Sequence, residues 1–307
     1  MTSSAAPALS TNALRFAHVS DLHLPFEPNL GWRERFSKRQ LSAWSWRRRR
    51  AVQRPEIIAG LRADLVSLQP EQLLVTGDIT NFSLPGEYVQ AEQWMTALAG
   101  HMAVNLVPGN HDVLVPVSET QGLGRWRRFT ADDQRWPWVV RRGPASFIGL
   151  CSAVTTAPLL ASGRLGAAQL DRLEAVLGEE GRAGQLRVVL LHHPLADGAV
   201  SARKALVDRG ALRAVLQRAG AELVLHGHAR QARLEAVPGP QGPIPVLCVP
   251  SSSALPNRHD EAARWHLVTL PAVGAPRWAR VLVRQWSLAK AAFVDAAAYD
   301  LRLPDAG

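Results

Sequence analysis

The sequence predicts an α/β fold whose sheets are covered by helices, and three observations support this prediction. The chain has 307 residues, of which 47% are hydrophobic and 20% charged, as expected for a packed globular protein. Short runs rich in Val, Leu and Ile alternate with longer amphipathic stretches along most of the chain. Beyond Arg230 the helical stretches stop, and the apolar runs that follow are expected to add strands to a sheet.

The expected strands are short apolar runs bounded by Gly, Pro or Asp. Six of them precede Arg230: Arg15–Ser20, Gln72–Gly77, Ala103–Val107, Ser146–Cys151, Arg187–Leu191 and Glu222–His226. Four more follow it: Arg233–Val237, Ile244–Val249, Trp265–Leu270 and Arg277–Trp286. The expected helices are Arg54–Leu68, Gly86–Leu98, Ala167–Leu177 and Ser201–Ala219.

The chain reads as one domain over residues 14–290, with a short disordered tail before it (1–13) and a C-terminal tail after it (291–307). Two segments, 26–54 and 113–143, depart from the alternation of strands and helices. Both carry Trp and Arg, and both follow the end of an expected strand. Long excursions of this kind in a compact domain are usually functional.

The cysteines and the N-terminus bear on location. Cys151 and Cys248 both sit in apolar runs, so we expect buried thiols in a reducing compartment rather than a disulfide framework. The N-terminus has no basic segment followed by an apolar one, and no apolar run approaches the ~20 residues of a membrane span. These features predict a cytoplasmic protein.

The net charge of +9 is concentrated in one segment. Nine basic residues and one acidic residue lie between Gly31 and Arg54, which leaves the remainder of the chain close to neutral. The charge therefore indicates a local basic patch and not a surface that is basic all round.

This basic segment also carries aromatic residues. If it is helical, one stripe contains Trp32, Phe36, Ala43 and Trp46, while Leu41 and Trp44 fall outside that stripe. Such a helix is typical of membrane surfaces, and we expect Arg47, Arg48, Arg49 and Arg50 to bind anionic lipid at the inner membrane face. Two alternatives stay open, namely nucleic acid, which we rank lower, and a solvated helix that packs on the domain by its Trp stripe.

Asp, His and Asn side chains follow five of the expected strands. In chain order the segments are DLH (21–23), GD (77–78), GNHD (109–112), HH (192–193) and GH (227–228). Each is common in turns when it occurs alone. In open α/β sheets ligands bind outside the carboxyl ends of the strands, so the five together predict one pocket. A mixed set of carboxylate, imidazole and amide ligands suits Mn, Fe or Zn better than Ca or Mg.

This order of motifs resembles that of the calcineurin-like metallophosphoesterase superfamily, whose pattern is D-x-H, G-D, G-N-H-[DE], H and G-H-x-H. The resemblance runs from about Arg15 to Arg230. It implies a four-layer αββα sandwich of two mixed sheets flanked by helices, with the metal site at the C-terminal ends of the strands. The motif spacing resembles that of class III cyclic nucleotide phosphodiesterases. The motif set is also shared with the UDP-diacylglucosamine pyrophosphate hydrolases, without a diagnostic segment of either branch.

The resemblance implies a site for two divalent metal ions, either Mn and Fe or Zn. The implied ligands are Asp21 and His23 for the first metal, Asp78 for both metals, and Asn110, His192 and His228 for the second. His192 is preferred to His193 because it comes directly off the strand, as the family ligand does. His111 resembles the histidine beside the leaving group, and Asp112 is expected to orient its ring by accepting a hydrogen bond.

The last motif departs from the family pattern in one ligand of seven. Arg230 stands where the family has the second histidine of G-H-x-H, and a guanidinium has no lone pair to give to a metal. The first metal is then weakly held, or Arg230 binds a substrate phosphate with its fork, or the site has lost turnover. We expect reduced but real activity, with metal binding dominated by the second site.

The predicted function is hydrolysis of a phosphodiester or pyrophosphate bond by a metal-bound hydroxide, on a nucleotide or lipid-linked substrate. Two alternatives stay open. One is a catalytically weakened phospholigand-binding protein on the same fold. The other is a Mn-dependent nuclease, which would bind DNA with a steep dependence on salt.

Overall fold

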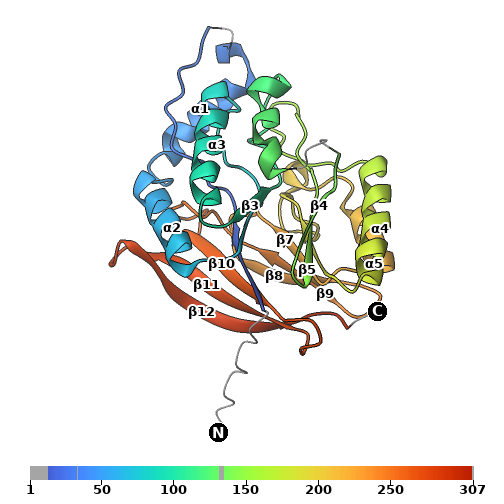
Figure 1. Ribbon diagram of the computed structural model, residues 1–307. Coiled ribbons are helices and arrows are strands. Elements are labelled where there is room, and N and C mark those ends of the chain that lie inside the picture. Colours follow the sequence, from blue (N-terminus) through green and yellow to red (C-terminus); the bar gives the residue numbers. More distant parts are fainter. Residues whose placement is uncertain (1–12, 33, 131–134, 306–307) are drawn as a thin grey trace.

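Two mixed six-stranded sheets pack face to face and are flanked by helices, as the computed structural model in Figure 1 shows. The structure describes residues 13–32, 34–130 and 135–305. Helices α1, α2 and α3 lie on one side of the molecule, and α4 and α5 lie on the other. The predicted fold class is therefore confirmed.

The first sheet has the strand order β12-β11-β10-β1-β2-β3. Its parallel half consists of β1 (Leu14–Val19), β2 (Gln72–Val75) and β3 (Ala103–Leu106). Its antiparallel half consists of β10 (Arg264–Leu270), β11 (Trp278–Ser287) and β12 (Ala292–Arg302). The helices over its outer face include α2 (Pro55–Leu68) and α3 (Pro85–Ala99).

The second sheet has the strand order β4-β5-β6-β7-β9-β8. Its parallel centre consists of β5 (Ala145–Gly149), β6 (Leu186–Leu190), β7 (Leu223–His226) and β9 (Ile244–Cys248). The antiparallel edges are β4 (Trp138–Arg142) and β8 (Arg233–Val237). Helices α4 (Ala167–Arg182) and α5 (Arg209–Ala219) cover its outer face.

The core between the sheets explains why the central strands read as continuous apolar runs. Phe16 of the first sheet meets Phe147 of the second edge to face, with ring centroids 5.4 Å apart. The opposite faces of the same strands are buried under the helices, where Leu73 packs beneath α2 and α3 and Val189 beneath α4 and α5. Strands buried on both faces need apolar residues at every position, so no alternation marks them in the sequence.

Two strands lie where no strand was predicted. β12 occupies residues 292–302, which the sequence analysis set apart as a C-terminal tail, and β4 lies within the excursion 113–143. In β12 the outward positions are small or polar, and Ala296 and Ala297 are exposed. The sequence therefore has no apolar run here that would predict a strand. Its pairing with β11 is what makes it a strand, and that pairing is a tertiary interaction.

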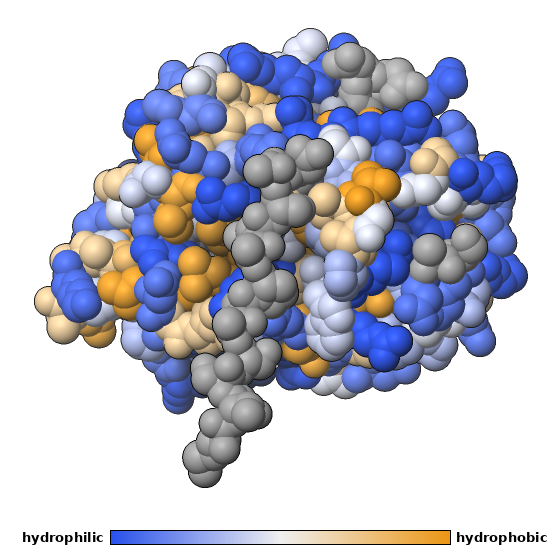
Figure 2. Space-filling view, turned by 60° about the horizontal axis from the view of Figure 1, so that its bottom comes forward, coloured by the Kyte–Doolittle hydropathy of each residue, from blue (hydrophilic) through white to orange (hydrophobic). Residues whose placement is uncertain are grey.

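The outer face of β11 and β12 mixes hydrophobic and hydrophilic residues. Figure 2 views the molecule from this end and shows hydrophobic patches broken up by hydrophilic residues rather than one continuous apolar area. Exposed Trp278 and Leu288 belong to β11 and to the turn that follows it. Isolated apolar residues of this kind are ordinary on protein surfaces.

The first excursion forms the 3₁₀ turn η1 (Glu34–Phe36) and helix α1 (Lys38–Arg49). The predicted single stripe is wrong. Ser37 caps the helix by accepting from the Arg39 amide at 3.2 Å, so Trp32 and Phe36 lie outside it and are exposed. The other two members of the stripe, Ala43 and Trp46, are buried against Phe82 and Leu84.

The basic end of α1 is described only in part. The side chains of Arg47, Arg48 and Arg49 lie outside the described residues, while the guanidinium of Arg50 lies 5.7 Å from the centroid of the Trp46 ring. The N-terminal tail predicted over 1–13 also lies outside the described residues, apart from its last position. In the described ranges no helix combines the length and the hydropathy that crossing a bilayer requires.

The second excursion packs on α3. It contains two further 3₁₀ segments, η2 (Glu119–Gln121) and η3 (Leu123–Phe129). The indole of Trp126 is fully buried and donates a hydrogen bond to the carbonyl oxygen of Tyr88 at 3.0 Å. The predicted helix over Ser201–Ala219 is shorter than expected, because a 3₁₀ turn η4 (Ala202–Lys204) and an extended stretch precede α5.

Candidate metal and phosphate site

The loops that leave the parallel strands hold the candidate site. Several of its residues have left-handed backbone conformations, with φ of +50° at Asp21, +40° at His23, +55° at Asp78 and +66° at His228. This conformation costs a non-glycine residue on the order of 1–2 kcal/mol. Strained residues persist where the surrounding structure fixes them, and they cluster at functional sites.

Two glycines are required where these loops approach one another. A Cβ atom at Gly109 would overlap the carboxylate of Asp78, and one at Gly227 would overlap the hydroxyl of Ser20 and the carboxylate of Asp21. The glycines of the GNH and GH motifs therefore allow backbone to pass directly beside the carboxylates.

The structure brings candidate metal ligands together in two sets that share one carboxylate. In the described part of the chain these sets are His23, Asp78 and His111, and Asp78, His192 and His228, with the ligand atoms of each set within 4.8 Å of one another. The Nε2 atom of His192 lies 3.3 Å from Oδ2 of Asp78, and that of His23 lies 3.9 Å from the same oxygen. Nε2 of His192 lies 3.1 Å from Nδ1 of His228.

Three of the imidazoles are held in one tautomer by backbone carbonyls. The ring nitrogens that face away from Asp78 contact the carbonyl oxygens of Thr80, Thr76 and Lys204. The distances are 3.1 Å for Nδ1 of His23, 2.6 Å for Nδ1 of His192 and 3.1 Å for Nε2 of His228. Because a carbonyl only accepts hydrogen bonds, the outer nitrogen carries a proton, and in the neutral ring the inner nitrogen carries the lone pair.

Asn110 adds a candidate oxygen ligand. Its side chain is buried, and within the described ranges its Oδ1 atom has no hydrogen-bond partner. Buried acceptors are almost always satisfied, so an amide oxygen without a partner beside two sets of imidazole and carboxylate ligands fits a cation site. The residues present therefore fit divalent transition metal ions.

The electrostatics of Asp78 and His192 indicate an ion pair before a cation binds. Burial by itself favours the neutral form of Asp78, but His192 and the neighbouring imidazoles outweigh it and hold the pKa of Asp78 well below its usual value. Burial likewise lowers the pKa of His192, but the carboxylates of Asp78 and Asp21 raise it to about 9. A cation bound here would take the place of that proton.

Asp21 lies beside the two sets and belongs to neither of those found among the described residues. Its Oδ2 accepts hydrogen bonds from the Ser20 hydroxyl at 2.7 Å and from the His228 amide at 3.0 Å. Burial raises the pKa of the Asp21 carboxyl. His193, which the sequence analysis passed over, contacts the Ser152 hydroxyl at 2.8 Å and the Ala161 carbonyl at 3.2 Å instead.

Asp112 has a different role from the predicted one of orienting His111. Its fully buried carboxylate accepts hydrogen bonds from the Thr80 hydroxyl and from four backbone amides, those of Asp78, Ile79, Thr80 and Gly109, at 2.8–3.1 Å. The Nδ1 atom of His111 instead contacts the carbonyl oxygen of Asn81 at 2.9 Å. Asp112 is therefore a positioning residue that holds the loop carrying Asp78.

Asp112→Asn is expected to lower the free energy of unfolding by about 2 kcal/mol, because an amide nitrogen would replace the oxygen that accepts from Asp78 and Gly109. Urea denaturation of the metal-free protein measures this loss. The exposed Asp171→Asn change is the control and should leave stability unchanged. Unaltered stability of Asp112→Asn combined with lost turnover would return Asp112 to the role of orienting His111.

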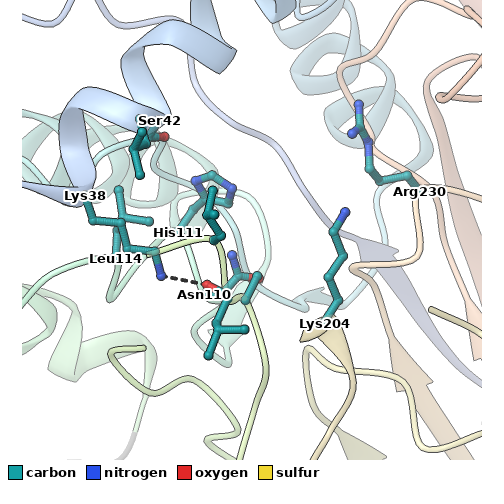
Figure 3. A pocket seen from close by; sticks show the side chains of 11 residues that line it. Lys38, Ser42, Asn110, His111, Leu114, Lys204 and Arg230 are labelled. Atoms are coloured by element: carbon teal, nitrogen blue, oxygen red, sulfur yellow. Dashed lines mark hydrogen bonds between the residues drawn. The ribbon is translucent and has the colours of Figure 1, made fainter. Parts of the chain in front are cut away.

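Arg230 forms an ion pair with Asp260. Its Nε and Nη2 atoms both contact the carboxylate of Asp260, which is buried and also accepts a hydrogen bond from the Asn257 side chain at 2.8 Å. The fork that was expected to bind substrate phosphate is thus occupied by Asp260. Figure 3 shows Arg230 on the opposite wall of the pocket from His111 and Ser42.

The pocket over the candidate site has a volume of about 240 Å³. Its lining residues are Lys38, Leu41, Ser42, Asn110, His111, Leu114, Leu159, Leu160, Ala161, Lys204 and Arg230. Lys204 stands on the same wall as Arg230, and Lys38 stands on the facing wall (Figure 3). Lys38 joins α1 to the loop opposite by donating to Thr156 Oγ1 at 2.7 Å and to the Leu160 carbonyl at 2.8 Å.

Lys38 and Lys204 were not predicted from the sequence. A single lysine carries no spacing signal, and Lys204 fell within a stretch that was assigned to a helix. The one available signal was the position of Lys204 after a strand end that already carried His192 and His193, because loops at these ends line the pocket.

The comparisons with known proteins agree with this geometry. Residues 14–229 match the family model described as calcineurin-like phosphoesterase. The chain is 24% identical over 278 residues to a probable cyclic nucleotide phosphodiesterase of Synechococcus sp., an alignment that covers 86% of this chain and 90% of that one.

Solved structures with the same fold include two phosphatases. A dimetal phosphatase from Danio rerio aligns with a TM-score of 0.62 at 12% identity and covers 94% of this chain and 98% of its own. A purple acid phosphatase from yellow lupin aligns with a TM-score of 0.61 at 13% identity, over 95% of this chain and about half (54%) of its own. The family match, the order of the strand-end motifs and the shared fold together show that this chain belongs to the calcineurin-like phosphoesterase family.

Proposed function

We propose that this protein is a metal-dependent phosphodiesterase. The observation that carries the proposal is one buried carboxylate, Asp78, shared by two sets of imidazole ligands at the strand ends. The probable cyclic nucleotide phosphodiesterase to which the chain is similar supports a diester substrate. Two bound cations would polarise the phosphoryl oxygens and lower the pKa of water, so that phosphorus is attacked near neutral pH.

The residues of the chain have two tasks at the cations in this proposal. Asp21, His23, Asp78, Asn110, His192 and His228 would hold the cations. Asp112 holds the loop that carries Asp78, through its hydrogen bonds to backbone amides. Manganese, iron and zinc are the cations that this mixture of imidazole and oxygen ligands favours.

The pocket walls suit a phosphate that carries organic groups. Lys204 lines one wall of the pocket, and we assign it to the phosphate charge because of this position (Figure 3). Leu159 is exposed at the pocket, 74% of its surface being accessible, and Leu160 lies beside it. An apolar rim next to a cation fits an aryl, nucleoside or lipid ester better than inorganic phosphate.

The test is hydrolysis of a bis-aryl phosphodiester by the manganese-loaded protein, with Lys204→Met beside the wild type. We expect wild-type turnover, and a KM raised about 5-fold in Lys204→Met, because a partly exposed charge contact to phosphate contributes about 1 kcal/mol. The exposed Lys290→Met change on the far hairpin serves as the matched control. A wild type that is silent with manganese, iron and zinc but still binds anions would instead support a phospholigand-binding protein.

We also propose that the segment around α1 contacts an anionic membrane surface, which would place a lipid-linked substrate at the pocket. Trp32, Phe36 and Trp44 are exposed, with 70%, 89% and 59% of their surfaces accessible. They belong to the segment that carries most of the net charge of the chain. Exposed aromatic residues interspersed with arginines are typical of helices that lie in the membrane interface.

Sedimentation with vesicles tests the membrane proposal. We expect the protein to pellet with phosphatidylserine-containing vesicles and not with pure phosphatidylcholine, and we expect Trp44→Ser to reduce the bound fraction severalfold. Trp278→Ser is the matched control, because Trp278 is similarly exposed (51%) at the far end of the fold. Equal binding to both kinds of vesicle, or none to either, would refute the proposal.

A further inference from the structure

We propose that His111 supplies a ligand nitrogen to the first cation, in place of the ligand that the chain lacks at position 230. This inference rests on the proposed metal-dependent function. The family pattern assigns a ligand to position 230 and gives the histidine of GNH a role outside the metal shell. In this chain the arginine at 230 and the position of His111 both argue for a different arrangement.

Arg230 is excluded as a ligand by its chemistry and by its contacts. A guanidinium offers no lone pair, and the fork of Arg230 is held by the buried carboxylate of Asp260. Asp260 is fixed in turn, since its backbone amide donates to the Asn257 side chain at 3.1 Å and its carboxylate accepts from Asn257 at 2.8 Å. No other His, Cys, Asp or Glu of the described residues completes a set with His23 and Asp78 except His111.

His111 lies where the missing ligand is needed. Its ligand atom, that of His23 and that of Asp78 all lie within 4.8 Å of one another. The rings of His111 and His23 meet nearly at right angles (86°), with centroids 4.9 Å apart. The backbone amide of His111 also donates to Oδ1 of Asp78 at 2.7 Å, which fixes the residue beside the shared carboxylate.

The ring of His111 is held by a backbone carbonyl in the same way as the rings of the other candidate histidine ligands. Its Nδ1 contacts the Asn81 carbonyl oxygen at 2.9 Å, so the proton lies on Nδ1 and the lone pair on Nε2. His23, His192 and His228 each show this arrangement, with the outer nitrogen on a backbone carbonyl. Such a partner sets the tautomer and orientation of a metal-binding histidine. All four imidazoles around Asp78 thus share one feature typical of ligands.

The assignment changes what His111 does in the reaction. An Nε2 atom whose lone pair is shared with a cation has no proton to donate to a leaving group. His23, Asp78 and His111 would then hold the first cation together with Asp21, while the second cation keeps its full set. The leaving group would depend on Lys204 and on water for neutralisation.

Calorimetric titration of metal-free protein with Mn²⁺ tests the inference without an activity readout. We expect two binding events in the wild type, and a 10- to 100-fold weaker first site in His111→Ala. Loss of a residue that only hydrogen-bonds to a metal ligand weakens metal binding by this much, so loss of a ligand should weaken it at least as much. Adding Arg230→His to His111→Ala should restore the first site, because the family ligand returns. His101→Ala, at an exposed position after α3, is the matched control and should change neither site.

Three outcomes separate the possibilities. Two wild-type-like binding events in both His111→Ala and His111→Gln, each folded by circular dichroism, would overturn the inference and leave the metal-dependent function standing. Weakening of the first site in His111→Ala that Arg230→His does not reverse would also overturn it, since the loss would then reflect a local distortion. A wild type that binds no Mn²⁺, Fe²⁺ or Zn²⁺ would overturn both the proposed function and this inference.

Discussion

Replacing Asp78 by alanine is expected to reduce phosphodiester hydrolysis by at least about 10³-fold. Asp78 is the member common to both sets of candidate ligands, so its loss removes an anchor from each cation at once. Cations contribute several kcal/mol to stabilising the charge that develops in phosphoryl transfer, and about 4 kcal/mol corresponds to a thousandfold change in rate. Turnover of the bis-aryl phosphodiester and the manganese content of the purified variant measure the effect.

The control for this variant must separate loss of the site from loss of the fold. Asp171→Ala, on the exposed face of α4, should keep full activity and metal content. Circular dichroism of Asp78→Ala must show a folded variant, because the change removes the carboxylate partner of the buried His192 imidazole. Turnover within tenfold of the wild type in Asp78→Ala would rule out a mechanism that depends on a shared carboxylate.

Replacing Glu222 by alanine is expected to lower the free energy of unfolding by about 3–5 kcal/mol. Glu222 is buried and binds the buried guanidinium of Arg187 through two hydrogen bonds, at 2.9 and 3.0 Å. It also accepts from Arg277, which precedes β11 of the other sheet, at 2.9 Å. Removing the carboxylate leaves a buried cation without its partner, which is the costly way to break an internal ion pair.

A surface pair provides the comparison for Glu222. Glu174 and Arg218 form the same kind of two-point contact between α4 and α5, but both side chains are well exposed. Glu174→Ala should therefore lower stability by less than about 1 kcal/mol. Urea denaturation of the two variants compares their losses in the free energy of unfolding. Equal losses would mean that burial adds nothing to the Arg187–Glu222 pair.

The features that could be predicted from the sequence are those that depend on residues close to one another along the chain. Gly109 and Gly227 are needed because the backbone passes beside a carboxylate at both positions. The polar residues after each apolar run mark the ends of the strands. This is why the fold class, the ten expected strands and the candidate ligand loops could be predicted. The family match over residues 14–229 has the same origin, since the motifs that define the family lie in those loops.

The sequence was uninformative where an interaction joins distant positions. Nothing local shows that Asp260 holds Arg230, that Asn81 contacts His111, or that β11 turns residues 292–302 into a strand. Asp112 was given the wrong partner for this reason. Its neighbour in sequence is His111, but its carboxylate folds back onto the amides of the loop around Asp78, thirty-odd residues earlier.

The left-handed residues at the strand ends have a consequence for how the protein responds to its surroundings. Asp21, His23, Asp78 and His228 are held in a disfavoured conformation by hydrogen bonds and, in our proposal, by cations. A ligand that binds only the folded chain stabilises it by about 2.7 kcal/mol at a hundred times its dissociation constant. The fraction of unfolded chain would then rise as the supply of metal falls. Proteases cleave unfolded chain, so the lifetime of the protein would fall with it.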